Sequence, residues 1–174
     1  GNKFSNEHEI IAKKKIIKIF KNYFQNIDAH VVFSFTVENA DFDCVVFTSN
    51  RVIILELKKI DNFLSGNENG NWKIIDSNGC KKIIFRNKNP FEQCSICRSK
   101  LNKSLNAYLP DLTPQKLAKN IDSGLLLYFK GSVKDDGNID NIIKNNPWFF
   151  CINIKDLNNQ TWLSTKQKLA ENRA

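Results

Sequence analysis

The sequence lacks the long apolar segments that mark membrane and exported proteins. No apolar run approaches the roughly 20 residues that a transmembrane helix needs. The first residues, GNKFSNEHE, do not contain the apolar stretch of a signal peptide. These absences argue against a membrane-spanning or exported chain, so we expect a cytoplasmic protein that does not bind a membrane.

Histidines and phosphate-binding motifs are also scarce. The two histidines, His8 and His30, have no evident serine or cysteine nucleophile arranged with them, which argues against a catalytic triad. The glycines at 66, 70 and 131 are not followed by the Gly-Lys-Ser/Thr ending of a phosphate-binding loop. Nucleotide hydrolysis within this chain therefore has no support, and an ATPase or helicase would have to be a separate partner domain.

The number and spacing of the cysteines do not indicate a disulfide framework. Five cysteines, an odd number, occur in a chain large enough to bury its own core, so reduced thiols are expected. Cys94 and Cys97 have metal-motif spacing, but they lie within a predicted helix without a second cysteine or histidine pair nearby. We expect no zinc site there, and we expect Cys44 in the core.

What the chain does contain is a hydrophobic core and a positive charge. Hydrophobic residues make up 41% of it and charged residues 25%, as in globular proteins. Its length of 174 residues predicts one domain over 1–174, which can belong to a longer protein. The net charge of +8 favours nucleic acid as a partner. However, abundant lysine, asparagine and isoleucine can equally reflect nucleotide bias in the coding genome.

Hydrophobic periodicity predicts a mixture of helices and strands. Residues Asn6–Phe24 have isoleucine and phenylalanine on one helical side and lysines mostly opposite. Short runs of Val, Ile and Phe predict strands, and Asn89-Pro90 predicts a capped helix start. The further expected elements are strands at His30–Val37, Phe42–Thr48, Arg51–Lys58, Trp72–Ile75, Lys81–Phe85, Ser123–Lys130 and Trp148–Ile154, and helices at Asn89–Tyr108 and Trp162–Ala170.

The order of these elements predicts the fold class. The first three strands should form an antiparallel meander, and the next two a hairpin around the Asn78-Gly79 turn signal. The last two strands are nearly continuous apolar runs, which suit buried and often parallel positions. We therefore expect an α/β domain with a central mixed sheet flanked by helices.

One predicted hairpin carries the residues that point to chemistry. Because strand side chains alternate, Glu56 and Lys58 lie on one face of their strand. If a two-residue turn follows position 48, residue 48 pairs with 51, 47 with 52, and Asp43 lies opposite Glu56. The two carboxylates would then share a face with Lys58.

This arrangement favours a divalent cation. Like charges at the end of an apolar hairpin repel each other, and desolvation adds to the cost. Mg²⁺ or Mn²⁺ bridging Asp43 and Glu56 would offset both, and Lys58 would orient a water or stabilise a phosphate. The plain alternative is an exposed Glu56–Lys58 pair at a strand end and Asp43 in a turn, and the hairpin geometry decides between the two.

Four features, taken in order, resemble the nuclease-related domain (NERD) family of the PD-(D/E)xK nuclease superfamily. A leading helix has an early glutamate, and ADFDCVVFTSNRVIILELKKI is similar to the family's acidic strand, turn and E-x-K strand. A polar loop with Gly66 and Trp72 precedes NPFEQ, which is similar to the family's N-P-x-x-Q. The apolar strand GLLLYF follows in the matching place, so the resemblance covers about residues 7 to 150.

The resemblance implies a restriction-endonuclease-like fold and assigns roles to particular residues. Asp43 and Glu56 would be metal ligands, Lys58 the catalytic lysine and Gln93 a site residue on the second helix. For the early helical glutamate we choose Glu9 as a further ligand and site residue. Glu9 lies near the centre of the apolar face, whereas the glutamate at position 7 points about 160° away.

The expected function is therefore an Mg²⁺- or Mn²⁺-dependent endonuclease that acts on DNA rather than RNA. Lys13, on the same helical side as Glu9, and Lys59 are candidates for contacts with nucleic acid, although Lys13 could simply extend along the edge of the apolar face. A nucleic-acid-binding or regulatory module that does not cut is the main alternative, and a basic structural domain is a third. A helicase or another partner domain, and a homodimer, remain compatible with the sequence.

Overall fold

The computed structural model describes residues 7–23, 28–49, 51–79, 81–84, 89–108, 118–128, 131–133 and 138–158. Its main element is a five-stranded sheet in the order β1-β2-β3-β7-β9. The strands are β1 (Ala29–Val37), β2 (Ala40–Thr48), β3 (Val52–Lys58), β7 (Ile121–Leu127) and β9 (Phe149–Asn153). β1, β2 and β3 pair antiparallel, and β3, β7 and β9 pair parallel, as predicted.

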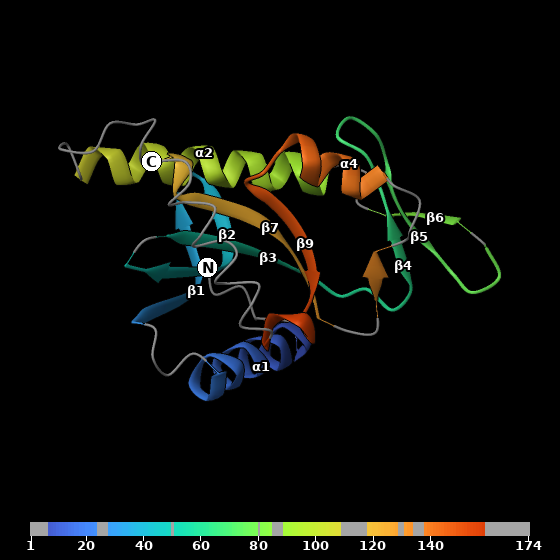
Figure 1. Ribbon diagram of the computed structural model, residues 1–174, viewed down its shortest axis with the longest axis horizontal. Helices are drawn as coiled ribbons and strands as arrows, with labels where there is room; N and C mark the ends of the chain where they lie inside the picture. Colours follow the sequence, from blue (N-terminus) through green and yellow to red (C-terminus); the bar gives the residue numbers. More distant parts are fainter. Residues whose placement is uncertain are drawn as a thin grey trace.

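Helices cover both faces of this sheet (Figure 1). α1 (Glu7–Tyr23) and the short 3₁₀ helix η1 (Asp156–Asn158) lie on one face, whereas α2 (Pro90–Tyr108) and α4 (Asn138–Asn145) lie on the other. α1 and α2 agree with the sequence prediction. The predicted helix Trp162–Ala170 lies outside the described residues. The expected α/β class with a mixed central sheet is confirmed, and the arrangement is compatible with a restriction-endonuclease-like fold.

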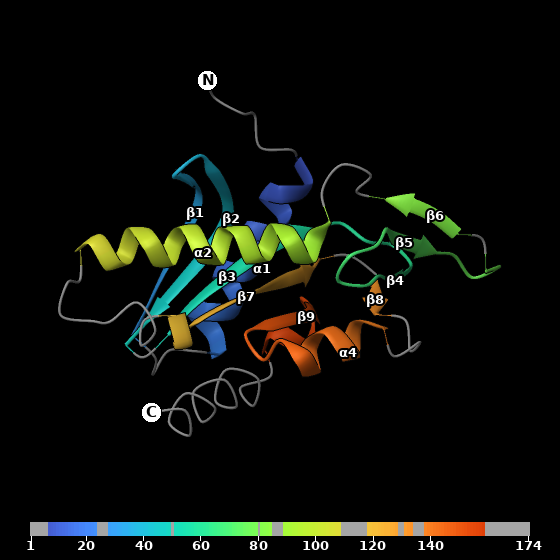
Figure 2. The same ribbon diagram turned by 90° about the horizontal axis from the view of Figure 1, so that it is seen from above.

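A second, smaller sheet has the order β6-β5-β4-β8 and projects to one side of the first, beyond the end of β3 (Figures 1 and 2). Its strands are β4 (Phe63–Ser65), β5 (Trp72–Ile75), β6 (Lys81–Ile84) and β8 (Ser132–Val133). The predicted β5–β6 hairpin is confirmed. β4, β8 and α4 were not predicted. Strands of two or three residues are too short to show a period of two, and the eight residues of α4 are fewer than helical periodicity needs for a firm prediction.

Apolar side chains alternate between the two faces of the central sheet and fill two layers. On the α1 face, Ile53, Leu55 and Leu57 of β3 pack in one cluster with Ala12 and Ile16 of α1. On the α2 face, Ile54 of β3 packs in another cluster with Cys97 and Leu101 of α2. Glu56 and Lys58 follow Ile54 on this second face, so the fold places them beneath α2.

The start of β7 differs from the prediction for a physical reason. The strand was expected to begin at Ser123, but it begins at Ile121 and includes the fully buried Asp122. Arg51 Nη2 lies 2.7 Å from Asp122 Oδ2, and Arg51 Nε donates to the same oxygen at 2.9 Å. In the sequence, a polar residue such as Asp122 is typical of a loop. Its burial in a strand is feasible only because Arg51, distant in the sequence, pairs with it.

Replacing Asp122 by asparagine should strongly destabilise the domain. Each side chain of this ion pair is 1% exposed, so the variant leaves the Arg51 charge buried without its carboxylate. Urea unfolding should show a loss of about 3–5 kcal/mol. The double variant Arg51→Met, Asp122→Leu should lose less, because no unpaired charge remains. A loss below about 1 kcal/mol in Asp122→Asn would contradict this account of the pair.

Candidate metal and phosphodiester site

The hairpin register expected from the sequence is present. The β2–β3 pairs run from Phe47↔Val52 to Cys44↔Leu55, and the chain reverses where Thr48 N–H donates to the carbonyl of Arg51 at 2.8 Å. The paired residues end at Cys44↔Leu55, one step before Asp43 and Glu56, so the predicted Asp43–Glu56 pair itself is not part of the ladder. Cys44 points to the other face and is fully buried there, as predicted.

Asp43 is turned towards the end of β3. Its Oδ2 accepts a hydrogen bond from the backbone N–H of Leu57 at 2.9 Å, so the carboxylate lies against the strand that carries Glu56. Its other oxygen accepts no hydrogen bond from the described residues. The side chain is half-buried, which leaves that oxygen within reach of a ligand.

Glu56 is a buried carboxylate that two polar groups hold in place. It is 5% exposed, and its Oε1 accepts hydrogen bonds from Lys58 Nζ and from Gln93 Nε2, both at 2.6 Å. Burial raises the pKa of the Glu56 carboxyl, and the charge of Asp43 raises it further, while Lys58 and Gln93 act in the opposite direction. The site therefore favours an added positive charge.

Lys58 and Gln93 form a bridge between β3 and α2. Lys58 Nζ lies 3.4 Å from Gln93 Oε1, so the amide of Gln93 donates to Glu56 and accepts from Lys58. The glutamine is placed by the start of α2, where Asn89 Oδ1 accepts the N–H of Phe91 at 2.9 Å. This is the predicted asparagine cap with proline at the first helical position.

Glu9 reaches the neighbourhood of the site from the opposite helix. It is half-buried on α1. Burial raises the pKa of Tyr128, and the charges of Glu9 and Asp43 raise it further, so both carboxylates lie within electrostatic range of this phenol. Among the described residues, however, no group of three His, Cys, Asp or Glu side chains is disposed to hold a metal ion. The structure thus groups Asp43, Glu56, Lys58 and Gln93, and sets Glu9 apart.

Two lysines predicted to contact nucleic acid occupy different surroundings. Lys13 Nζ donates to Ser34 Oγ at 2.6 Å, so this lysine connects α1 to β1. Lys59 directly follows β3 and is exposed. His30 is also exposed, and its Nε2 lies 4.0 Å from Asp28 Oδ1. The side chains of His8 and Glu7 lie outside the described residues.

A cavity of about 500 Å³ opens beside Asp43 and Gln93. The tip of the β1–β2 hairpin forms one wall and the first three turns of α2 the other, with Asp41, Glu92 and Lys100 along its sides. Its size lies within the range of small-ligand sites, so a nucleotide-sized group can enter. Cys97 also lines it, and burial raises the pKa of this thiol to about 11, which keeps it protonated and unreactive.

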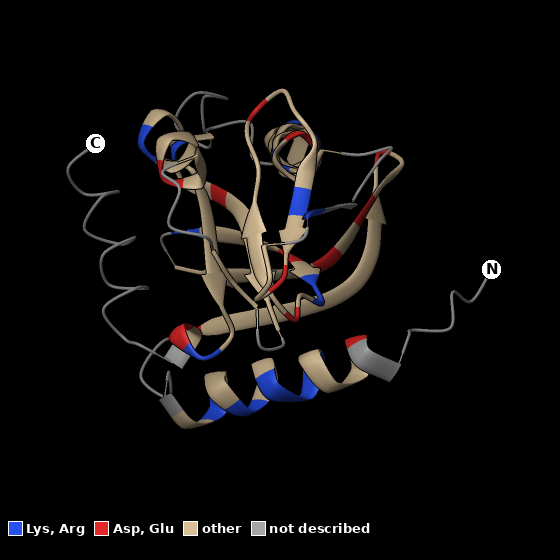
Figure 3. Cartoon of the chain, turned by 90° about the vertical axis from the view of Figure 1, so that its right-hand side faces the viewer, with Lys and Arg blue, Asp and Glu red and all other residues tan. Residues whose placement is uncertain are grey.

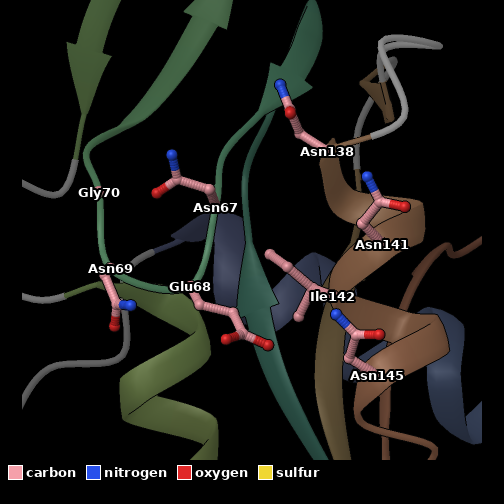
Figure 4. Close-up of a pocket in the computed structure, with 8 residues that line it drawn as sticks. All are labelled: Asn67, Glu68, Asn69, Gly70, Asn138, Asn141, Ile142 and Asn145. Atoms are coloured by element: carbon pink, nitrogen blue, oxygen red, sulfur yellow. The ribbon is translucent and has the colours of Figure 1, made fainter.

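A second cavity, of about 430 Å³, lies between the loop after β4 and helix α4 (Figure 4). Asparagine side chains dominate both of its walls, and its one carboxylate, Glu68, already accepts a hydrogen bond from Asn146. Asn89 donates to the carbonyl of Glu68 and so fixes the loop against the start of α2. Among the described residues, no lysine or arginine lines this cavity.

Sequence analysis missed Tyr128 and Ser34. Tyr128 follows β7, the parallel neighbour of β3, and its N–H donates to the carbonyl of Lys58 at 3.2 Å. Carboxyl ends of parallel strands meet at one edge of a sheet, and this rule could have found Tyr128 once β3 and β7 were paired. Ser34 gives no such signal, because it lies within an otherwise regular strand pattern.

The donor set fits a hard divalent cation. Mg²⁺ is usually held by one or two carboxylates and completes its shell with water and phosphate oxygens. Asp43 and Glu56 supply two such carboxylates from neighbouring strands, and each has an oxygen that accepts no hydrogen bond from the part of the chain that the structure describes. Burial is the main cause of the raised pKa of Glu56 and the charge of Asp43 adds to it, and a cation would offset both.

Comparison with known families agrees with this geometry. Residues 6–120, more than half of the chain, match the nuclease-related domain family. No curated protein and no solved structure gives a significant match. The matched segment contains α1, the three-stranded meander and the whole of α2, and therefore includes Asp43, Glu56, Lys58 and Gln93. The chain belongs to the nuclease-related domain family.

Proposed function

We propose that this domain is a nuclease that hydrolyses phosphodiester bonds of DNA with the help of Mg²⁺ or Mn²⁺. The observation that carries the proposal is the grouping of Asp43, Glu56 and Lys58 near the end of β3, where Glu56 is buried and Asp43 and Lys58 are half-buried. Lys58 Nζ lies 2.6 Å from Glu56 Oε1, and Asp43 is hydrogen-bonded to the intervening residue, Leu57. Two carboxylates and one ammonium group are the groups that phosphodiester hydrolysis requires, and Asp43 lines an open cavity.

Each residue has a distinct role in the proposal. Asp43 and Glu56 hold the cation, with Glu9 contributing from α1 when substrate is bound. The bound cation would neutralise charge on the phosphate and lower the pKa of a water. Lys58 donates to an oxygen of the phosphate or to the attacking water, and Gln93 keeps the Lys58 ammonium and the Glu56 carboxylate in register.

The charge distribution supports a nucleic acid substrate. The chain has a net charge of +8, and basic residues follow the length of α1 (Figure 3). Lys14, Lys15 and Lys18 are exposed on that helix, and Lys100 lines the candidate cavity. Lysines in such positions attract the phosphate backbone without reading the base sequence. DNA rather than RNA is the substrate in this proposal.

The competing function is a nucleic-acid-binding or regulatory module that keeps the fold and does not cut. The burial of the Glu56 carboxylate near Asp43 speaks against it, because a buried charge close to a like charge destabilises a protein that has no use for it. Such a nuclease could act beside a helicase or another partner domain, or as a homodimer. The proposal does not depend on either.

A cleavage assay tests the proposed function. Single- and double-stranded DNA and RNA should be incubated with the protein in Mg²⁺, in Mn²⁺ and in EDTA. We expect cleavage of DNA in either metal, none in EDTA, and none by the variant Glu56→Gln. Binding of all substrates without cleavage in either metal would instead support the regulatory module, and metal-independent cleavage would overturn the metal site.

No helix in the described ranges is both long enough and apolar enough to cross a membrane.

A further inference from the structure

The ladder between β1 and β2 is interrupted at one position. Pairs run from Ala29↔Thr48 to Phe33↔Cys44, stop, and resume from Phe35↔Phe42 to Val37↔Ala40 in the same register. The missing pair is Ser34 with Asp43. Ser34 has φ of 53°, a left-handed conformation that residues other than glycine rarely adopt.

The interruption reverses which face each strand presents. In a regular strand, residues two apart share a face. Here Phe33 packs in the cluster beneath α1, whereas Phe35 packs in the cluster beneath α2. The partner strand changes in the same way, because Cys44 lies in the first cluster and Phe42 in the second. Both strands therefore turn over at Ser34 and Asp43.

This reversal decides where the Asp43 carboxylate points. Phe42 is fixed beneath α2, where its ring stacks on that of Phe35 at 5.0 Å. A regular strand cannot place both Phe42 beneath α2 and Cys44 beneath α1. Alternation counted from Phe42 would turn Asp43 towards α1, away from Glu56. The interruption instead lets Phe42 keep its place while the Asp43 carboxylate reaches the N–H of Leu57. The candidate site thus depends on the conformation of Ser34.

A side chain from α1 holds this conformation. Lys13 Nζ donates to Ser34 Oγ at 2.6 Å, and the charge of Lys13 also acts on the Cys44 thiol, the neighbour of Asp43. A left-handed conformation costs a non-glycine residue free energy, and such conformations persist only when surrounding contacts hold them. The Lys13–Ser34 contact is such an interaction, made between two elements far apart in the sequence.

We propose that Lys13 and Ser34 are positioning residues: their contact holds the interruption of the β1–β2 ladder that aims Asp43 at the end of β3. This inference rests on the proposed function where DNA cleavage is measured. Its structural part concerns only the hydrogen bond between Asp43 and the Leu57 N–H. It gives Lys13 a role other than binding phosphate, because its ammonium group is committed to Ser34.

Three substitutions separate the parts of this proposal. Ser34→Val suits a regular strand but is strongly disfavoured at positive φ, so it should straighten the ladder and turn Asp43 away. Ser34→Gly adopts positive φ without strain and should retain the site. Lys13→Met removes the contact without adding a steric conflict, and Lys14→Met, on the exposed side of the same helix, is the matched control.

The first measurement is hydrogen exchange of the Leu57 amide by NMR in metal-free protein. The amide should exchange about tenfold or more faster in Ser34→Val and in Lys13→Met than in the wild type, because it loses a bond to a charged acceptor. Ser34→Gly and Lys14→Met should stay within about threefold of the wild type. Unchanged exchange in folded Lys13→Met would overturn the proposal, whatever Ser34→Val does to the fold.

The second measurement is the Mn²⁺ concentration that gives half-maximal DNA cleavage. It should rise about 10- to 100-fold in Lys13→Met, as for residues that orient a metal ligand, while Ser34→Gly should keep the wild-type value. An unchanged Mn²⁺ requirement in Lys13→Met, with cleavage lost through weaker DNA binding, would make Lys13 a phosphate contact and overturn the proposal. If the wild type cuts no nucleic acid, the proposed function fails, and the exchange measurement still decides the positioning role.

Discussion

Replacing Lys58 by methionine should lower kcat for DNA cleavage by about 10²–10³-fold, the usual cost of one donor that stabilises developing charge. The Lys58 ammonium is 2.6 Å from Glu56 Oε1 and only 14% exposed, so it is preorganised beside the carboxylates. Methionine keeps most of the apolar stem and removes the charge. The loss should therefore appear in kcat, measured with saturating DNA and Mn²⁺, because few other contacts change.

Metal binding should separate this effect from damage to the site. Lys58 competes with a cation for Glu56, so Mn²⁺ affinity in Lys58→Met should equal or exceed that of the wild type. Lys144→Met is the control, because Lys144 is exposed on α4 and has no proposed role in the site or in DNA binding, and it should leave kcat unchanged. An equal drop in kcat in both variants would mean that general basicity, and not the position of Lys58, matters.

Replacing Asp43 by asparagine should abolish metal-dependent cleavage, with a loss of about 10³-fold or more if the cation supplies several kcal/mol to the transition state. Asparagine has the same shape and can still accept the N–H of Leu57 through its side-chain oxygen, so the fold should be retained. Its neutral oxygen is a weaker ligand for a hard cation. The variant should therefore lose metal binding while its folded structure stays intact.

Thermal unfolding with and without Mn²⁺ measures this loss directly. Mn²⁺ should raise the Tm of the wild type and leave that of Asp43→Asn unchanged, since only a ligand bound to the folded state stabilises it. Without metal, the variant should be at least as stable as the wild type, because Asp43 no longer raises the pKa of Glu56 by repulsion. Asp41→Asn, in the same cavity, is the control and should keep the Mn²⁺ response.

The hairpin at the centre of the site could be predicted because its rules are local. Strand alternation and a two-residue turn predicted the pairs from Phe47↔Val52 to Cys44↔Leu55, and with them the place of Glu56 one step further along β3. The start of α2 was equally predictable, because an asparagine cap followed by proline has one common meaning. The placement of Gln93 near Glu56, by contrast, came from the family resemblance.

What could not be predicted depends on contacts between distant parts of the chain. β7 begins at Ile121 because Arg51, far away in sequence, neutralises Asp122. The reversal at Ser34 depends on Lys13 and on packing beneath two helices, and an alternating pattern of residues hides it. The distance of Glu9 from the two other carboxylates likewise depends on how α1 packs, which helical periodicity does not determine.

Calorimetric titration of Mn²⁺ into the metal-free protein is the most direct test of the central claim that Asp43 and Glu56 hold a divalent cation. The wild type should release or absorb heat with saturable binding, and Glu56→Gln should show no binding at the same concentrations. The Lys58→Met variant should bind. Equal binding by the wild type and Glu56→Gln, or no binding by the wild type, would contradict the claim.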